Sequence, residues 1–211
     1  MSLIIAIDGV DGAGKTTLID TLGRYLNNNG YSYSVVTAVT SKNNGLDMSG
    51  LPDISNSLYS VISQLGYDNS TSWYFIYAGH QYALDRALAT SQKFNDIVVF
   101  MDRSLLSMMV YQDCDTKQQE DLIFRDLLPR YNSIVDWTIL LSPPAEVIEE
   151  RLASKGKDEI ESAIDVEYII NDYKFNMGYI DTETTILTDQ TFIELELLQR
   201  ELISKLKGDK S

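Results

Sequence analysis

A short glycine-rich stretch near the amino terminus has the residue types and spacing of a phosphate-binding loop. It reads GVDGAGKT over residues 9–16, which matches G-x-x-x-x-G-K-[ST], and it lies between an apolar run and a helical pattern. The glycines allow backbone N–H groups to turn inward around a phosphate, and a helix amino terminus adds partial positive charge. We expect Lys15 to reach the β and γ oxygens of a triphosphate and the Thr16 hydroxyl to bind Mg²⁺. The alternative is a glycine-rich turn with a solvated lysine, which does not explain the agreement of strand, loop and helix patterns.

Two carboxylates accompany this loop, Asp8 just before it and Asp11 within it. A carboxylate inside an anion-binding loop is costly unless it contacts Mg²⁺ or a substrate hydroxyl, so Asp11 is a candidate binding residue. The alternative is a turn-forming aspartate bonded to nearby backbone. The loop alone does not define a reaction, since GTPases, motor ATPases and small-molecule kinases share it. The sequence has no N/T-K-x-D-like motif for guanine, which disfavours a GTPase.

An Asp-Arg pair follows a second apolar run. Residues 97–101 read IVVFM, which is typical of a central strand, and Asp102 and Arg103 come directly after it. If this strand lies beside the first one, Asp102 comes next to the glycine-rich loop and would hold a Mg²⁺-bound water. Arg103 would then point toward the transferred phosphoryl group, because its planar guanidinium can span oxygens of two phosphates. Taken alone, the pair also fits a capping aspartate beside a surface arginine.

The elements that would carry these residues alternate along the chain. Apolar runs without strict alternation predict strands covered on both faces, and the stretches between them suit helices. The predicted strands are Leu3–Asp8, Tyr33–Val39, Ile97–Met101, Trp137–Leu141 and Thr184–Leu187. The predicted helices are Gly14–Leu26, Ile54–Leu65, Trp73–Gln92, Gln118–Leu128, Ala145–Ala153, Val166–Tyr179 and Phe192–Leu206. This order predicts a doubly wound α/β fold that binds ligands outside the carboxyl ends of its strands.

Length and composition limit the remaining choices. The 211 residues contain no internal repeat or Pro-rich linker, so we expect a single domain, with flexible loops at Asn43–Pro52 and Ser154–Ser162. A net charge of −14 disfavours a nucleic-acid polymer as partner. Cys114 is the only cysteine, which excludes an intramolecular disulfide and suits a reducing, cytoplasmic setting. The apolar run near the amino terminus is too short for a signal peptide or a membrane span, so we expect no membrane association.

The residues around Arg103 carry a longer signature. Residues 102–112 read DRSLLSMMVYQ, which resembles the D-R-[YF]-x-x-S-x-x-A-Y-Q signature of thymidylate kinases at identical spacing. The loop from Gly9 to Thr17 looks like that family's phosphate loop, and residues 144–151 contain its later P-x-E-x-x-x-x-R segment. The resemblance implies a P-loop NTPase fold with a five-stranded parallel sheet, helices on both faces and a short lid. It further implies ATP and Mg²⁺ as cofactors, a nucleotide substrate and a homodimer.

The resemblance also assigns roles to residues. Arg103 would bind the acceptor 5'-phosphate, Asp11 the deoxyribose 3'-hydroxyl, and Tyr111 would crowd the sugar 2' position. The cofactor-binding residues would be Gly9, Asp11, Gly12, Ala13, Gly14, Lys15, Thr16 and Thr17, with Thr16 and Asp102 as metal ligands. The substrate-binding residues would be Asp11, Lys42, Phe75, His80, Arg103, Ser107, Tyr111 and Gln112.

The base-binding segment departs from the family pattern. An aromatic residue of Trp73–Tyr77 would stack on the base, but the family places an arginine four residues after its stacking phenylalanine. Here Phe75 is followed at that spacing by Gly79, and Ile76 by His80. His80, the only histidine, would replace that arginine, or else be a packed or surface residue of its helix.

A basic segment follows the predicted helix Ala145–Ala153. Arg151, Lys155 and Lys157 place three cations within seven residues of an acidic chain. By resemblance, the segment from about residue 151 to 162 is the lid, whose cations close over ATP. These cations would take part in catalysis together with Lys15, Asp102 and Arg103. Family members usually carry arginines where the two lysines stand, and lysine lacks the bidentate fork. The alternative is a solvated basic turn.

The resemblance implies transfer of the ATP γ-phosphoryl group to the 5'-phosphate of a deoxynucleoside monophosphate, with dTMP as the expected acceptor. An ionised phosphate needs no general base, so catalysis would consist of positioning and charge neutralisation. After the second strand, thymidylate kinases have a phosphate-binding arginine, whereas deoxynucleoside kinases have a glutamate that acts as general base. Residues 39–43 of this chain read VTSKN and contain neither. Lys42 in this segment favours an anionic acceptor. The nearest alternative is a deoxynucleoside kinase that phosphorylates a 5'-hydroxyl, since such enzymes carry a similar Glu-Arg-Ser. A noncatalytic P-loop switch that binds ATP is the alternative from another class.

Overall fold

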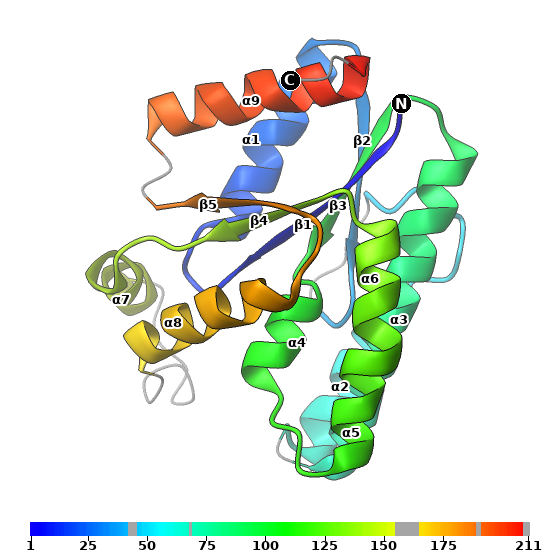
Figure 1. The fold of residues 1–211 in the computed structure, drawn as a ribbon, viewed down its shortest axis with the longest axis vertical. Coiled ribbons are helices and arrows are strands. Elements are labelled where there is room, and N and C mark those ends of the chain that lie inside the picture. Colours follow the sequence, from blue (N-terminus) through cyan, green and yellow to red (C-terminus); the bar gives the residue numbers. More distant parts are fainter. Residues whose placement is uncertain (42–45, 68, 155–164, 189–190, 209–211) are drawn as a thin grey trace.

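A five-stranded parallel sheet forms the centre of the molecule (Figure 1). The computed structural model describes residues 1–41, 46–67, 69–154, 165–188 and 191–208. The strands are β1 Leu3–Gly9, β2 Ser32–Thr37, β3 Ile97–Asp102, β4 Trp137–Leu141 and β5 Glu183–Leu187. Their order in the sheet is β2-β3-β1-β4-β5, so β1 lies between β3 and β4. The α/β fold predicted from the apolar runs is confirmed.

Helical segments connect the strands, and several begin at polar caps. The α-helices are α1 Lys15–Asn28, α2 Ser55–Leu65, α3 Ser70–Lys93, α4 Leu105–Tyr111, α5 Lys117–Leu122, α6 Leu128–Ile134, α7 Ala145–Ser154, α8 Val166–Asn176 and α9 Phe192–Lys207. The described residues also contain the π-helical turn η1 Ile123–Leu127 and the 3-10 turn η3 Met177–Tyr179. Asn69 caps α3 by accepting a hydrogen bond from the Thr71 amide at 2.8 Å. In the part of the chain that the structure describes, no helix is both long enough and apolar enough to cross a membrane.

Helices cover both faces of the sheet. Leu3, Ile5 and Ile7 of β1 lie in the core shared with α1 and α9, which lie side by side on one face (Figure 1). Ile4 and Ala6 lie in the opposite core, with α3, α4 and α6. Because the central strands are buried on both faces, they need no polar alternation. This burial explains the continuous apolar runs in the sequence.

Helix α4 is an element that the sequence patterns do not predict. It follows β3 directly and buries four consecutive residues, Leu105 to Met108. A helix of seven residues has little stability of its own in water, so its formation depends on tertiary contacts. Those contacts come from Asp8 at the end of β1, which accepts hydrogen bonds from the amides of Ser104 and Ser107.

The helix predicted to end at Leu128 continues to Ile134. Pro129 lies within this continuation, at the start of α6. Proline lacks an amide hydrogen and crowds the preceding turn, which normally ends or kinks a helix. The wider π-helical turn η1 comes immediately before it and accommodates the irregularity.

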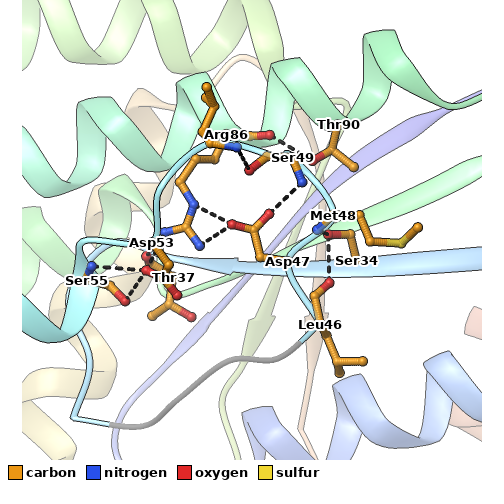
Figure 2. A network of polar contacts seen from close by, with 11 residues as sticks. Ser34, Thr37, Leu46, Asp47, Met48, Ser49, Asp53, Ser55, Arg86 and Thr90 are labelled. Carbon is orange, nitrogen blue, oxygen red and sulfur yellow. Dashed lines mark hydrogen bonds and ion pairs between the residues drawn. The ribbon is translucent and has the colours of Figure 1, made fainter.

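The loop predicted to be flexible at Asn43–Pro52 is tied down over its described part. The Ser34 hydroxyl donates a hydrogen bond to the Leu46 carbonyl at 2.9 Å and accepts one from the Met48 amide at 3.0 Å (Figure 2). These contacts anchor the returning chain to β2. Residues 42–45 and most of the second predicted loop, Ser154–Ser162, lie outside the described residues.

Candidate active site

The glycine-rich loop joins the end of β1 to the start of α1, as the sequence pattern predicts. Gly12 and Gly14 have φ values of +86° and +104°, which side-chain-bearing residues rarely adopt. A Cβ atom on Gly12 would also lie 3.2 Å from Leu152 of α7. The N-cap of α1 is Gly14, which provides no side-chain cap, so the first-turn amides and the helix dipole face the loop. This geometry suits an anionic ligand.

Lys15 lies across the loop instead of extending into solvent. Its ammonium donates hydrogen bonds to the carbonyls of Gly9 at 2.7 Å and Val10 at 3.1 Å. Burial, followed by the positive charge of Arg103, lowers the pKa of Lys15 to about 8. The nearby carboxylates of Asp11, Asp102 and Asp8 act in the opposite direction and favour the charged form.

Asp11 brings the two predicted catalytic cations together. The Arg103 guanidinium forms an ion pair with Asp11 Oδ1, and the Lys15 ammonium lies 3.7 Å from the same oxygen. Burial raises the pKa of the Asp11 carboxyl, but the charges of Arg103 and Lys15 outweigh burial and hold it below its ordinary value. Lys15 and Arg103 therefore face one shared site, although 88 positions separate them in the chain.

Arg103 has an unusual backbone conformation. Its φ of +68° lies in the left-handed region, which costs a non-glycine residue about 1–3 kcal/mol. Its amide donates to the Ile7 carbonyl of β1 at 3.1 Å, and the following amide, of Ser104, donates to Asp8 Oδ1 at 2.9 Å. These bonds hold the turn after β3 against the end of β1, and they direct the Arg103 side chain toward Asp11.

Asp8 is the centre of a buried hydrogen-bond network. Its carboxylate is fully buried and accepts hydrogen bonds from the Ser104 hydroxyl and from the Ser107 hydroxyl, the latter at 2.7 Å. The network continues to the Tyr173 hydroxyl, 3.0 Å from Ser107 Oγ, and to the Tyr131 hydroxyl, 3.3 Å from Ser104 Oγ. Burial raises the pKa of both tyrosines, so they stay neutral. Ser107, a predicted substrate-binding residue, thus has its hydroxyl inside this network.

The predicted metal ligands lie at the end of β3 and in the first turn of α1. Asp102 is half-buried at the end of β3, near enough to Lys15 for its charge to raise the lysine pKa. Thr16 and Thr17 are exposed in the first turn of α1. One carboxylate and one hydroxyl beside a phosphate loop fit the sparse protein ligation that Mg²⁺ prefers, with waters and phosphate oxygens completing its coordination.

Arg151 of α7 also reaches the loop. Its Nη1 donates hydrogen bonds to the carbonyls of Gly12 and Ala13, both at 3.2 Å. Lys15, Arg103 and Arg151 therefore converge on one place in a chain whose net charge is −14. The other predicted cations, Lys42, Lys155 and Lys157, lie outside the described residues.

A pocket of about 260 Å³ lies between the end of α4 and the start of α3, and its lining includes the carboxylates of Asp113 and Asp115. Tyr111, Gln112 and Trp73 line it, and the Arg103 guanidinium lies 5.8 Å from the centre of the Tyr111 ring. Phe75, the named candidate for base stacking, is instead half-buried against the core. Within the predicted aromatic segment, Trp73 is the residue on the pocket wall.

His80 is a buried residue of α3. Burial, assisted by the charge of Arg103, lowers the pKa of His80 to about 4, so the imidazole is neutral near pH 7. It therefore cannot supply the fixed positive charge of the arginine that it would replace. A neutral imidazole can still donate or accept one hydrogen bond toward a base.

Comparison with known proteins agrees with this geometry. A family model described as thymidylate kinase matches residues 7–177, which contain the loop, the Asp-Arg pair and the α4 signature. The chain belongs to the thymidylate kinase family. Membership supports a nucleotide kinase, and members of this family generally use ATP and Mg²⁺. A crystal structure of YorR from Bacillus subtilis has the same fold, with a TM-score of 0.58 and 15% identity over 99% of both chains.

Some residues around this site are not marked by the sequence motifs. Tyr131 and Tyr173 come from α6 and α8, far from the loop in sequence, and nothing in their spacing indicates contact with the Asp8 network. Asp8 itself is visible in the sequence only as a carboxylate beside the loop. Its complete burial, and its hydrogen bonds from the amides and hydroxyls of Ser104 and Ser107, result from the pairing of β1 with β3.

Replacement of Asp8 with Asn should destabilise the protein. The Asn oxygen can keep the donors that Oδ1 accepts, but its NH₂ group would face the Ser104 hydroxyl, and the remaining hydrogen bonds would lose the negative charge of their acceptor, at a cost of about 1–3 kcal/mol. Urea denaturation measures the change in the free energy of unfolding. The control is Asp20→Asn, at an exposed position of α1, for which we expect a change within about 0.5 kcal/mol. Equal stability of the two variants would contradict this role of Asp8.

His80 should make stability depend on pH below neutrality. The unfolded imidazole binds a proton near its ordinary pKa of 6.5, whereas the folded one resists protonation down to about 4. The unfolded state therefore binds more protons as the pH falls, and the free energy of unfolding decreases. Between pH 7 and pH 5, wild type should lose about 2 kcal/mol more than His80→Gln, measured by urea denaturation at each pH. Parallel pH curves for the two proteins would show that His80 titrates normally.

Proposed function

We propose that this protein transfers the γ-phosphoryl group of ATP to the 5'-phosphate of a deoxynucleoside monophosphate, with dTMP as the first candidate acceptor. The observation that carries the proposal is the shared ion-pair partner of Lys15 and Arg103. Both cations lie at one Asp11 oxygen, as required of groups that hold the two ends of a transferred phosphoryl group. Family membership supports the same reaction class.

In this proposal each cation neutralises one part of the reacting phosphates. Lys15 binds the β and γ oxygens of ATP, and Arg103 binds the acceptor phosphate. The acceptor phosphate replaces Asp11 as the partner of Arg103, and the released carboxylate accepts a hydrogen bond from the deoxyribose 3'-hydroxyl. Arg151, with Lys155 and Lys157 of the proposed lid, neutralises further charge over ATP. Thr16 and Asp102 would hold Mg²⁺, which would supply positive charge to the ATP phosphates.

The surroundings of β2 support a phosphate acceptor over a nucleoside hydroxyl. A nucleoside kinase needs a carboxylate near the end of this strand to take the proton from the 5'-hydroxyl. Residues 38–41 contain none, and the next carboxylates, Asp47 and Asp53, are both ion-paired with the buried Arg86. An acceptor phosphate is already ionised and needs no such base. Lys42 is proposed to add positive charge on this side.

The acceptor base is proposed to occupy the pocket beside Tyr111. Gln112 would offer its amide to the base, and Trp73, whose ring is buried and stacked on Tyr77, would contribute to the pocket wall. His80 is not one of the residues that line this pocket. The YorR crystal structure is of a complex with phosphorylated GDP, so guanine belongs in any test of the base. By family resemblance we further propose a single cytoplasmic kinase domain that forms a homodimer.

An acceptor panel tests the proposed reaction. Coupled assays of ADP release should show turnover with dTMP well above the rate without acceptor, and none with thymidine. The panel also contains dGMP, dAMP and dCMP. Turnover with thymidine but not with dTMP would support a deoxynucleoside kinase. ATP binding together with ADP release that is indifferent to every acceptor would support a noncatalytic switch.

Lys15→Ala should abolish most of this turnover without unfolding the chain. The loss removes a preorganised positive charge from the transferred phosphoryl group, and such losses lower kcat by at least about a hundredfold. Circular dichroism checks the fold. The control is Lys117→Ala, at an exposed position of α5, which should keep the wild-type rate. An undiminished rate in Lys15→Ala would rule out the mechanism.

A further inference from the structure

A buried arginine in the middle of α3 joins three segments of the chain (Figure 2). Arg86 is 1% exposed. Its Nε donates to Asp47 Oδ2 at 2.7 Å, and its Nη1 contacts Asp53 Oδ1 at 2.9 Å and the Thr37 carbonyl at 3.4 Å. Its remaining nitrogen, Nη2, also forms an ion pair with Asp47. The planar guanidinium thus contacts two carboxylates and a backbone carbonyl at once, which a lysine cannot reproduce.

Each partner of Arg86 belongs to the chain that leaves and returns to β2. Thr37 is the last residue of β2. Asp47 lies on the returning segment, where its other oxygen accepts a hydrogen bond from the Ser49 amide at 2.8 Å. Asp53 accepts from the amide of Ser55, the first residue of α2, at 3.0 Å. Arg86 therefore fixes the end of β2, the returning segment and the start of α2 to α3.

The Asp53 carboxyl is held in its charged form. Burial raises its pKa, but the hydrogen bonds from Ser55 and the charge of Arg86 outweigh burial and lower it below its ordinary value. The buried Arg86 charge would be strongly unfavourable without these carboxylates, so loss of one partner destabilises the whole cluster.

The segment that Arg86 fixes borders the acceptor side of the site. Thr37 pairs in register with Asp102, the residue before Arg103. Seven residues before Arg86, two turns along the same face of α3, lies Gly79. A Cβ atom there would lie 3.0 Å from the Ala38 carbonyl, so the chain leaving β2 runs directly against the helix. The next residue, His80, is near enough to Arg103 for its pKa to respond to the arginine charge.

We propose that Arg86 is a positioning residue for the acceptor nucleotide: it holds the chain that leaves β2 against α3, so that this wall of the acceptor site is in place before the nucleotide binds. The inference rests on the proposed function. The sheet order places β3 between β2 and β1, so the Arg86 cluster is attached to a strand that is not adjacent to the one carrying the ATP-binding loop. Loss of the cluster should therefore affect the acceptor and leave ATP binding unchanged.

Steady-state kinetics of Arg86→Lys and Asp53→Asn test this role, with the best deoxynucleoside monophosphate of the acceptor panel as probe. Arg86→Lys keeps the charge and loses the fork, so KM for the acceptor should rise roughly tenfold while KM for ATP stays within about twofold. Asp53→Asn should act in the same direction but less, because its Oδ1 can still accept from Ser55 and Arg86. A general loss of stability would not raise KM for the acceptor while leaving KM for ATP unchanged.

The matched control is Asp85→Asn, also on α3. It breaks the ion pair between Asp85 and Arg130, which does not involve the β2 segment, and both KM values should match wild type. If Arg86→Lys does not fold by circular dichroism, Asp53→Asn decides the result, because this carboxylate is partly exposed. An unchanged acceptor KM, or an equal rise in KM for ATP, overturns the role of Arg86 alone. A wild-type protein without turnover on any acceptor overturns the proposed function and this inference with it.

Discussion

Asp8 is a buried carboxylate at the end of the central strand, and both halves of the site depend on the hydrogen bonds that it accepts. The phosphate loop begins one residue after it, and the turn bearing Arg103 is held by its bonds to Ser104 and Ser107. A buried carboxylate is tolerable only when its oxygens are fully paired, so its position strongly limits the position of its donors. The short helix α4 and the left-handed Arg103 are consequences of this requirement.

Charge balance explains why Asp11 lies between Lys15 and Arg103. Lys15 and Arg103 are two cations brought close together, and burial, followed by the charge of Arg103, lowers the pKa of Lys15. Asp11 compensates for this by pairing with both. An arrangement in which one small anion neutralises two cations is suited to exchange, because a phosphate can take the same position with more negative charge.

Pairing of an arginine with carboxylates also occurs beside the edge strand β2, where it serves a different purpose. Arg86 is 1% exposed and pairs with Asp47 and Asp53, so its partners belong to the protein chain (Figure 2). It is therefore suited to holding segments together, whereas the partly exposed pair of Arg103 and Asp11 is suited to ligand exchange. Exposure of the ion pair distinguishes these two uses of arginine.

The sequence by itself determined the strands, most helices and the location of the phosphate loop, because these depend on local periodicity and on a motif whose backbone needs glycine at specific positions. It also indicated that Arg103 belongs beside Lys15, since parallel strands place their carboxyl ends at one edge. Only the tertiary structure decided the partners of Asp8, the burial of His80, the position of Trp73 on the pocket wall and the Arg86 cluster. Each of these is a contact between segments far apart in the chain, and the burial that shifts a pKa or pairs a charge has no signature in local spacing. Helix α4 shows the difference between local and tertiary information. Its residues are visible in the sequence, but the carboxylate that stabilises it, Asp8, comes from another strand.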